Sequence, residues 1–206
     1  MIISYAITVC NELEEIIRLL NFLQTNIREE DEIVIQYDEQ SVTNEVMDYL
    51  SLMDKMHKYK IIGFPLNKDF AKFKNNLNAH CNGDYIFNID ADEIPSEHLV
   101  QWLHEVLESN PVDVIYVPRI NTVEGLTQGH IDKWKWNVNE RGWVNFPDYQ
   151  MRIYKNKEGI EWNKPVHESI IGWETFSNFP AHEEWCLSHP KEIKRQEIQN
   201  EFYETI

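Results

Sequence analysis

The chain has 206 residues, enough for one sizeable hydrophobic core and short for two, so we expect a single domain. Its 42% hydrophobic and 26% charged residues are close to the averages of globular proteins and argue against a disordered chain. The formal net charge of −16 repels phosphate backbones, which argues against a nucleic-acid-binding protein. A nucleotide held through a divalent cation is still compatible with this charge.

Short apolar strands alternate with amphipathic helices through residue 118. The apolar runs predict strands at 2–9, 33–35, 60–64, 85–89 and 112–117. The helical spacing of apolar residues predicts helices that begin at Glu12 after an Asn11 cap, span 43–57 and 69–80, and follow a Ser96 cap. This alternation indicates an α/β protein with a doubly wound, mostly parallel central sheet flanked by helices.

The second half of the chain has a different character, because six of the seven tryptophans fall there among Gly, Asn and Pro residues. We expect strands at 149–154 and 166–171 and a charged helix at 191–203. No linker-like stretch separates the halves. We therefore predict one domain over 1–206, with a nucleotide-binding half at 1–118 and an acceptor-side half at 119–206 that ends in the C-terminal helix.

The sequence predicts no membrane span and no signal peptide. No apolar run reaches the roughly 20 residues that a transmembrane helix needs, and the apolar N-terminus lacks a basic start and a cleavage site. Cys10, Cys81 and Cys186 are odd in number and lack metal-ligand spacing, so we expect reduced thiols and a cytoplasmic location. Peripheral association with a membrane is compatible with these features.

Three carboxylates, Asp90, Asp92 and Glu93, follow the strand predicted at 85–89. Open α/β sheets bind ligands outside the carboxyl ends of their strands. Side chains two residues apart in an extended segment point the same way, so Asp90 and Asp92 can converge on one cation that offsets their repulsion. Carboxylate oxygens suit Mg²⁺ or Mn²⁺, and either ion can also hold a diphosphate. A solvated acidic turn is the alternative.

The acidic segment resembles the Asp-x-Asp motif of GT-A glycosyltransferases, specifically of family 2. The resemblance begins at 3–12, continues at Asp38 and extends through 70–75, where Lys74 stands in the place of the usual Arg. It implies a single GT-A-type, Rossmann-like domain and a nucleotide-sugar donor whose usual base is uracil. It also implies nucleotide contacts at the following residues: Thr8, Cys10, Asn11, Glu12, Asp38, Lys74, Asp90 and Ala91.

Two later segments, 147–154 and 165–168, resemble the arginine strand and the His-Glu step of a narrower subgroup. That subgroup includes bacterial lipopolysaccharide-core β-glucosyltransferases. The segment 189–200 is similar to the closing helix of the same subgroup. The resemblance therefore covers nearly the whole chain, and it implies a glycan or a lipid-linked glycan as the acceptor.

The implied reaction is an inverting, metal-dependent hexosyl transfer, in which the cation stabilises the leaving nucleoside diphosphate. Asp92 is expected to bind the ion directly. Asp90 is expected to bind it through water or to hold the ribose. His167 is a third candidate ligand, because imidazole suits Mn²⁺ better than Mg²⁺, and a structural hydrogen bond is its alternative.

Inversion also requires a carboxylate that deprotonates the incoming hydroxyl group. The Asp/Glu-Asp pair that supplies it in many similar enzymes is absent, which leaves Glu168 and Asp148 as candidates. A salt bridge at the end of a strand is the alternative for Glu168. Arg152 is expected to form an internal ion pair or to meet phosphate, and Glu93 either caps the next segment or holds the acceptor.

Two other kinds of residue have plain structural interpretations beside functional ones. Lys74 is able to reach a diphosphate, but a solvated lysine on a helix is the default. His182 and His189 resemble a metal pair, yet we expect packing and capping rather than zinc.

The tryptophans of the second half bear on the acceptor. Trp134, Trp136 and Trp143 lie on a Gly- and Asn-rich stretch that is able to form a loop over the site. Aromatic faces stack on the apolar faces of sugars, and a small core beneath the loop is the alternative.

Two other function classes share some of these features. A metal-dependent nucleotidyltransferase has a similar sheet and acidic metal site, but usually carries a Gly-rich phosphate loop that is absent from 8–12. A non-catalytic module that binds nucleotide sugars or glycans is the third class.

Overall fold

The computed structural model describes residues 1–57 and 59–203. Its helices are α1 (Leu13–Asn26), α2 (Asn44–His57), α3 (Phe70–Asn78), α4 (Glu97–Ser109), α5 (Gln128–Trp134) and α6 (Ile193–Tyr203), with a 3₁₀ helix η1 (Glu183–Trp185). Its strands are β1 (Ile3–Val9), β2 (Glu32–Asp38), β3 (Lys60–Phe64), β4 (Tyr85–Asp90), β5 (Ile94–Pro95), β6 (Val114–Glu124), β7 (Val144–Lys155), β8 (Glu161–Asn163), β9 (Ser169–Ile171), β10 (Phe176–Asn178) and β11 (Leu187–Glu192).

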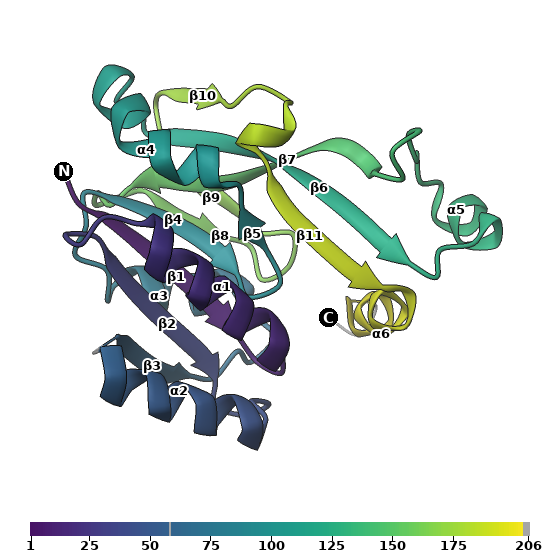
Figure 1. The fold of residues 1–206 in the computed structure, drawn as a ribbon, viewed down its shortest axis with the longest axis horizontal. Helices are drawn as coiled ribbons and strands as arrows, with labels where there is room; N and C mark the ends of the chain where they lie inside the picture. The colour runs from purple at the N-terminus through teal and green to yellow at the C-terminus, as the bar shows by residue number, and fades with distance from the viewer. Residues whose placement is uncertain (58, 204–206) are drawn as a thin grey trace.

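One central sheet runs through the chain in the order β3-β2-β1-β4-β7-β6-β11-β5, with β10 paired to β6 (Figure 1). Strands β1 to β4 are parallel to one another, whereas β7 lies antiparallel between β4 and β6. Strands β8 and β9 form a separate antiparallel pair. The predicted α/β class with a mostly parallel central sheet is confirmed.

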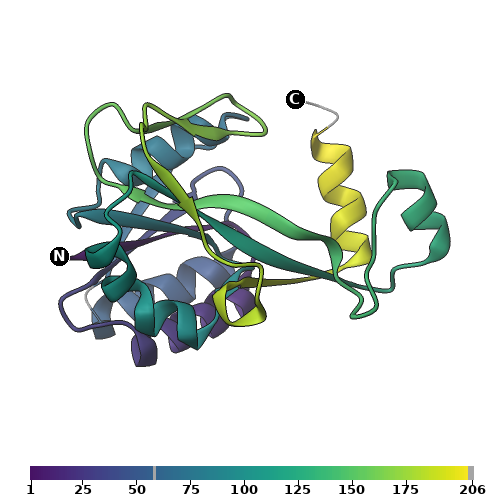
Figure 2. The same cartoon turned by 90° about the horizontal axis from the view of Figure 1, so that it is seen from above.

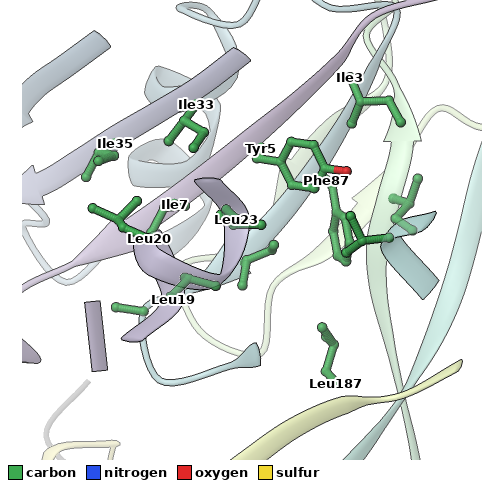
Figure 3. Close-up of a cluster of buried hydrophobic side chains, with 14 of the residues drawn as sticks. Ile3, Tyr5, Ile7, Leu19, Leu20, Leu23, Ile33, Ile35, Phe87 and Leu187 are labelled. Atoms are coloured by element: carbon green, nitrogen blue, oxygen red, sulfur yellow. The ribbon is translucent and has the colours of Figure 1, made fainter. Parts of the chain in front are cut away.

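Alternation along the central strands produces two hydrophobic cores. Ile3, Tyr5 and Ile7 of β1 point to the face covered by α1, α2 and α4, where they join the larger core (Figure 3). Ala6 and Val34 point to the opposite face and pack with α3 and the β8–β9 pair. Figure 2 shows these two layers on opposite sides of the sheet, with α6 rising on the side of α3.

The strand order reverses at β1, which positions the site. From β1 the chain continues to β2 on one side, and β4 pairs on the other side, with Thr8 of β1 opposite Asp90 of β4. The segments that leave these carboxyl ends diverge, and ligands of such sheets bind in the crevice between them.

Several predicted boundaries differ from the structure. The N-cap of α1 is Glu12 and not Asn11, and no side-chain hydrogen bond caps the helix. The Glu12 carboxylate instead accepts hydrogen bonds from the preceding backbone N–H groups of Cys10 (2.7 Å) and Asn11 (3.0 Å). The Ser96 cap of α4 is confirmed by a 3.1 Å hydrogen bond from the N–H group of Leu99 to its hydroxyl.

The largest differences lie in the second half. Strands β6 and β7 are longer than predicted, the strand predicted at 166–171 is reduced to β9, and the sequence did not predict β11 or α5. Within the described part of the chain, no helix combines the length and the apolar character that crossing a bilayer would need.

Replacing Leu20 should test the larger core. Leu20 is fully buried on α1, so we expect Leu20→Ala to lower the free energy of unfolding by about 2–5 kcal/mol through lost burial and a cavity. Urea unfolding measures this change. Leu52→Ala is the matched control, because Leu52 is 51% exposed and its truncation should change stability by only about 0.5 kcal/mol. Equal losses in the two variants would contradict the assignment of the core.

Candidate active site

A cavity of about 970 Å³ lies at the carboxyl edge of the sheet, over the point where the strand order reverses. The predicted site residues that line it are Thr8, Cys10, Asn11, Glu12, Asp38, Lys74, Asp90, Ala91, Asp92, Asp148, Arg152, His167 and Glu168. Glu93 alone among the predicted site residues does not line it. The fold thus gathers side chains from both halves of the chain around one space.

Asp90 is anchored on both oxygens. The Thr8 hydroxyl donates to Oδ1 at 2.9 Å, and Nη2 of Arg152 donates to Oδ2 at 2.6 Å. Burial alone would raise the pKa of Asp90, but the charges of Arg152 and Lys74 outweigh it and hold the pKa well below its usual range. These partners fix Asp90 in place as a carboxylate, although 33% of its side chain is still exposed.

Glu93 completes a buried ion-pair network behind Asp90. Its side chain has no exposed surface, and Oε1 accepts from Arg152 at 2.5 Å and from Arg119 at 2.8 Å. Oε2 accepts a 3.3 Å hydrogen bond from the N–H group of Asp90. Full burial argues against the predicted contact between Glu93 and an acceptor. Arg152 forms the internal ion pair that we expected.

Asp92 faces the cavity with looser contacts than Asp90. Its Oδ2 lies 3.4 Å from Nε2 of His189 and 3.7 Å from Nη2 of Arg195, and its side chain is 14% exposed. Burial alone would raise the pKa of Asp92, but the hydrogen bond and charge of His189 lower it to about 2. Asp92 is therefore a carboxylate at neutral pH that a ligand is able to reach.

The orientation of His189 is set by a chain of hydrogen bonds. Asn121 donates through Nδ2 to Oδ2 of Asp148 at 2.8 Å, so its Oδ1 faces Nδ1 of His189 at 2.6 Å. Nδ1 must therefore carry the proton, which directs Nε2 toward Asp92. His189 was expected to be a packing or capping residue; its ring is buried and hydrogen-bonded, and it also lines the cavity.

Asp148 is saturated with donors. Arg119 donates to Oδ2 through Nε (2.9 Å) and Nη2 (2.7 Å), and Gln150 donates to Oδ1 at 2.7 Å. Burial alone would raise the pKa of Asp148, but the charge of Arg119 outweighs this effect, and the pKa is lowered from its usual value. A carboxylate with a lowered pKa and occupied oxygens is a poor general base, which argues against that role for Asp148.

Lys74 and Glu168 form a pair in the wall of the cavity. Nζ of Lys74 lies 2.7 Å from Oε1 of Glu168 and 4.5 Å from the centre of the Trp162 ring. Lys74 is only 4% exposed, so the expectation of a solvated lysine was wrong. Burial of this charge is tolerable because three groups compensate it: the carboxylate of Glu168, the Trp162 ring and the carboxylate of Asp90 at 3.9 Å.

The end of the cavity that was predicted to hold the nucleotide lies between the ends of β1 and β2. Oδ1 of Asp38 accepts from the N–H groups of Gln40 (3.2 Å) and Leu66 (3.0 Å), which fixes its side chain at the end of β2. Burial, aided by the charge of Glu12, raises the pKa of the Cys10 thiol to about 11. Cys10 is therefore a neutral thiol at the edge of the site.

Arg195 holds α6 against α1. Its guanidinium donates to Glu12 at 2.6 Å and to Glu15 at 2.7 Å, and the same group is the one near Asp92. The predicted C-terminal helix thus supplies one wall of the cavity.

Sequence reasoning missed Arg119 and Asn121. The two side chains are two residues apart on β6 and therefore share a face. That alternation was a usable signal, but the strand was predicted to end at 117.

The sequence model of Glycosyl transferase family 2 matches residues 4–174. The chain belongs to this family. The family predicted from the motifs is confirmed. The match does not distinguish the lipopolysaccharide-core subgroup, which stays a prediction.

Solved structures share the family 2 fold at low identity. S. aureus TarS 1–349 matches 92% of this chain and 60% of its own length, with 13% identity and a TM-score of 0.65. The same TarS segment in complex with UDP-GlcNAc matches 93% and 59%, with 14% identity and a TM-score of 0.64. The mannosyltransferase PcManGT from Pyrobaculum calidifontis, in complex with GDP-Man and Mn²⁺, matches 57% and 35%, with 15% identity and a TM-score of 0.50.

The family 2 chain thus spans about 60% of the TarS segment that it matches. No protein of curated function matches it significantly. The likeness to TarS confirms the predicted GT-A-type fold.

The residues predicted to bind a metal do not by themselves supply a complete set of ligands. Among the described residues, no three His, Cys, Asp or Glu side chains gather in a group that could hold an ion, so Asp90, Asp92 and His167 do not form a complete set. The carboxylate of Asp92 and Nε2 of His189, once that nitrogen has lost the proton it donates to Asp92, fit an ion whose other ligands come from a diphosphate and water. His167 lines the same cavity, and its role as a ligand stays a prediction.

Arg152→Met should test the buried network through its pH dependence. Because the folded-state pKa of Asp90 is lowered, its contribution to stability is present at neutral pH and is lost as the pH falls through that pKa. Removing Arg152 leaves buried charge unpaired, so we expect a loss of about 3–5 kcal/mol at neutral pH. The difference from the wild type should shrink toward about pH 4, where an unpaired carboxyl group takes up a proton.

Urea unfolding at the two pH values measures these differences for Arg152→Met. Arg18→Met is the control, because Arg18 is exposed on α1. A loss that does not change with pH would contradict the assigned electrostatic role.

Proposed function

We propose that the chain transfers a hexosyl group from a nucleotide sugar to a hydroxyl group of a glycan or lipid-linked glycan, with Mn²⁺ or Mg²⁺ at the diphosphate. A UDP sugar is the proposed donor. TarS in complex with UDP-GlcNAc and PcManGT with GDP-Man and Mn²⁺ support a nucleotide-sugar donor and a divalent ion. The observation that carries the proposal is Asp92, a reachable carboxylate beside a directed imidazole in the cavity.

The order of residues along the carboxyl edge of the sheet supports an orientation for the donor. Asp38 ends β2, Thr8 lies near the end of β1, and Asp92 follows β4, which is the next strand in the sheet. We place the nucleoside near Asp38 and the diphosphate near Asp92.

Cations and carboxylates both line the cavity. Five of the 19 Lys and Arg side chains line it: Lys74, Arg119, Arg152, Lys191 and Arg195. Burial lowers the pKa of Lys191, and Asp92 opposes that change. Six carboxylates line it as well: Glu12, Asp38, Asp90, Asp92, Asp148 and Glu168. The two signs nearly balance, so a bound divalent cation would supply the positive charge that a diphosphate needs.

A bound Mn²⁺ or Mg²⁺ would act as a Lewis acid on the leaving diphosphate. The chain's own contribution is to hold Asp92 deprotonated and to direct Nε2 of His189. Asp148 acts at a distance, because it fixes Asn121, which in turn fixes His189.

Glu168 is the proposed general base. Lys74 occupies its Oε1, so we assign Oε2 to the proton of the acceptor hydroxyl. As that proton moves to Glu168, the acceptor oxygen forms a bond to the anomeric carbon and the bond from this carbon to the phosphate oxygen breaks. A single displacement of this kind inverts the anomeric centre without a sugar–enzyme intermediate.

The lipopolysaccharide-core-like subgroup and the cytoplasmic location are also proposals. The subgroup rests on 147–154 and 165–168, segments that contribute Asp148, Arg152, His167 and Glu168 to the cavity. The location rests on the three cysteines, which are free thiols in the structure.

Asp92→Asn should test the ion site. We expect binding of Mn²⁺ in the presence of UDP to weaken by about 100-fold or more, because a neutral amide replaces the charged ligand. Calorimetry measures the affinity and a thermal shift checks the fold. Asp54→Asn is the matched control, since Asp54 is exposed on α2. UDP binding to the wild type that is indifferent to Mn²⁺ would refute the proposed role of Asp92.

Glu168→Gln should separate catalysis from donor binding. We expect kcat to fall by about 10²–10⁴-fold, because the amide cannot accept the proton, while the Kd for UDP and Mn²⁺ changes little. Asp148→Asn should instead weaken binding of the ion through Asn121 and His189. Near-wild-type turnover of Glu168→Gln would contradict Glu168 as the general base and leave Asp148 as the candidate for that role. Absence of any transfer or donor hydrolysis by the wild type, with UDP bound, would favour a non-catalytic module.

A further inference from the structure

Residues 125–146, which connect β6 to β7 and include the first three residues of β7, carry aromatic side chains that belong to neither hydrophobic core. We call this segment the aromatic arm. Its rings are paired with one another: Trp134 and Trp136 have centroids 4.7 Å apart, and Trp143 and Phe146 have centroids 4.8 Å apart. No aromatic of the arm is among the described residues of either core. The rings therefore do not serve the packing of the sheet.

Trp136 is the ring that the arm presents to the cavity. Trp134 stacks with His130 at 5.3 Å and lies under Lys133, and Trp143 lies under Arg141. Of the aromatics in the arm, only Trp136 lines the cavity. Trp134 packs against Trp136 and is itself stacked on His130.

Helix α6 faces the arm across the cavity mouth. Ile198 of α6 is 67% exposed and lines the same cavity as Trp136. His130 of the arm lies 3.6 Å from Glu197 of α6, and α5 is drawn beside α6 in Figure 2. An apolar surface built from two elements thus borders the cavity. Asn145 and Gln196, which also line it, add amide groups.

This surface lies on the far side of Asp92 from the nucleotide end. In the sheet order, β2 with Asp38 is two strands to one side of β4, and β6, where the arm begins, is two strands to the other side. A donor that extends from Asp38 to Asp92 leaves the arm side free for a second substrate.

We infer that Trp136 and Ile198 form a binding subsite for a sugar ring of the acceptor. The apolar C–H face of a pyranose stacks on the indole ring, and the amides of Asn145 and Gln196 meet its hydroxyl groups. Trp136 is partly buried in a cavity rather than projecting from a surface, which favours a sugar over a lipid bilayer as its ligand. The inference rests on the proposed function and names the acceptor class of that site.

The test uses the full chain with UDP and Mn²⁺ bound. The probes are the methyl glycosides of glucose, galactose and N-acetylglucosamine, and saturation-transfer NMR measures their binding. At least one glycoside should bind the wild type, and Trp136→Ala should weaken it about tenfold, which corresponds to about 1.4 kcal/mol. Trp136→Phe keeps a ring and should retain most of the affinity. UDP binding should be unchanged in both variants.

Trp102→Ala is the matched control, because Trp102 is 45% exposed on α4 and does not line the cavity. Failure of every glycoside to bind the wild type, or equal binding to Trp136→Ala, would overturn the inference. So would loss of binding to phosphatidylserine vesicles in Trp136→Ala with sugar binding intact, since that result marks a membrane contact. Glycoside binding without UDP binding would support the subsite and contradict only the proposed donor.

Discussion

Arg152 holds together the acidic turn on which the site depends. It is 3% exposed and bonds both to Asp90 and to Glu93, which has no exposed surface. Its Nε has no hydrogen-bond partner among the described residues, so its bonds go through the two terminal nitrogens. Burial of these charged groups is tolerable only because each finds a partner of opposite sign. The network fixes the residues on either side of Asp92 and thereby aims that carboxylate at the cavity.

The two aspartates of the motif therefore differ in role although they lie two residues apart. Asp90 is held by close bonds to Thr8 and Arg152, although 33% of its side chain is exposed. Asp92 is 14% exposed and has only the looser contacts of His189 and Arg195. Asp90 therefore serves as a counter-charge to Arg152, and Asp92 has fewer close partners to give up to a ligand. The division follows from what each side chain meets, since the two residues have the same chemistry.

The fold of the first 118 residues could be predicted because its signals are local. Strand β3 has the same ends as the predicted strand, and α4 has the predicted Ser96 cap. Strand β11 escaped prediction because Ser188, His189 and Pro190 show no apolar alternation. It is placed by pairing with β6, which no local pattern reveals.

The membership of the site was more predictable than the roles within it. Motif resemblance placed nearly all of the predicted residues around one cavity. The role of Lys74 was missed because its partner Glu168 lies 94 residues away. The role of His189 depends on an amide of β6 and a carboxylate after β4, so it emerges only when three distant segments meet.

The attachment of α6 by Arg195 makes part of the site sensitive to ionic strength. The guanidinium is 33% exposed, and its bonds to Glu12 and Glu15 are of the kind that dissolved salt screens. The buried contacts of Arg152 are shielded from this effect. Salt would thus loosen the wall that carries Ile198 while leaving the acidic turn in place, so that the two ends of one cavity respond differently to the same buffer.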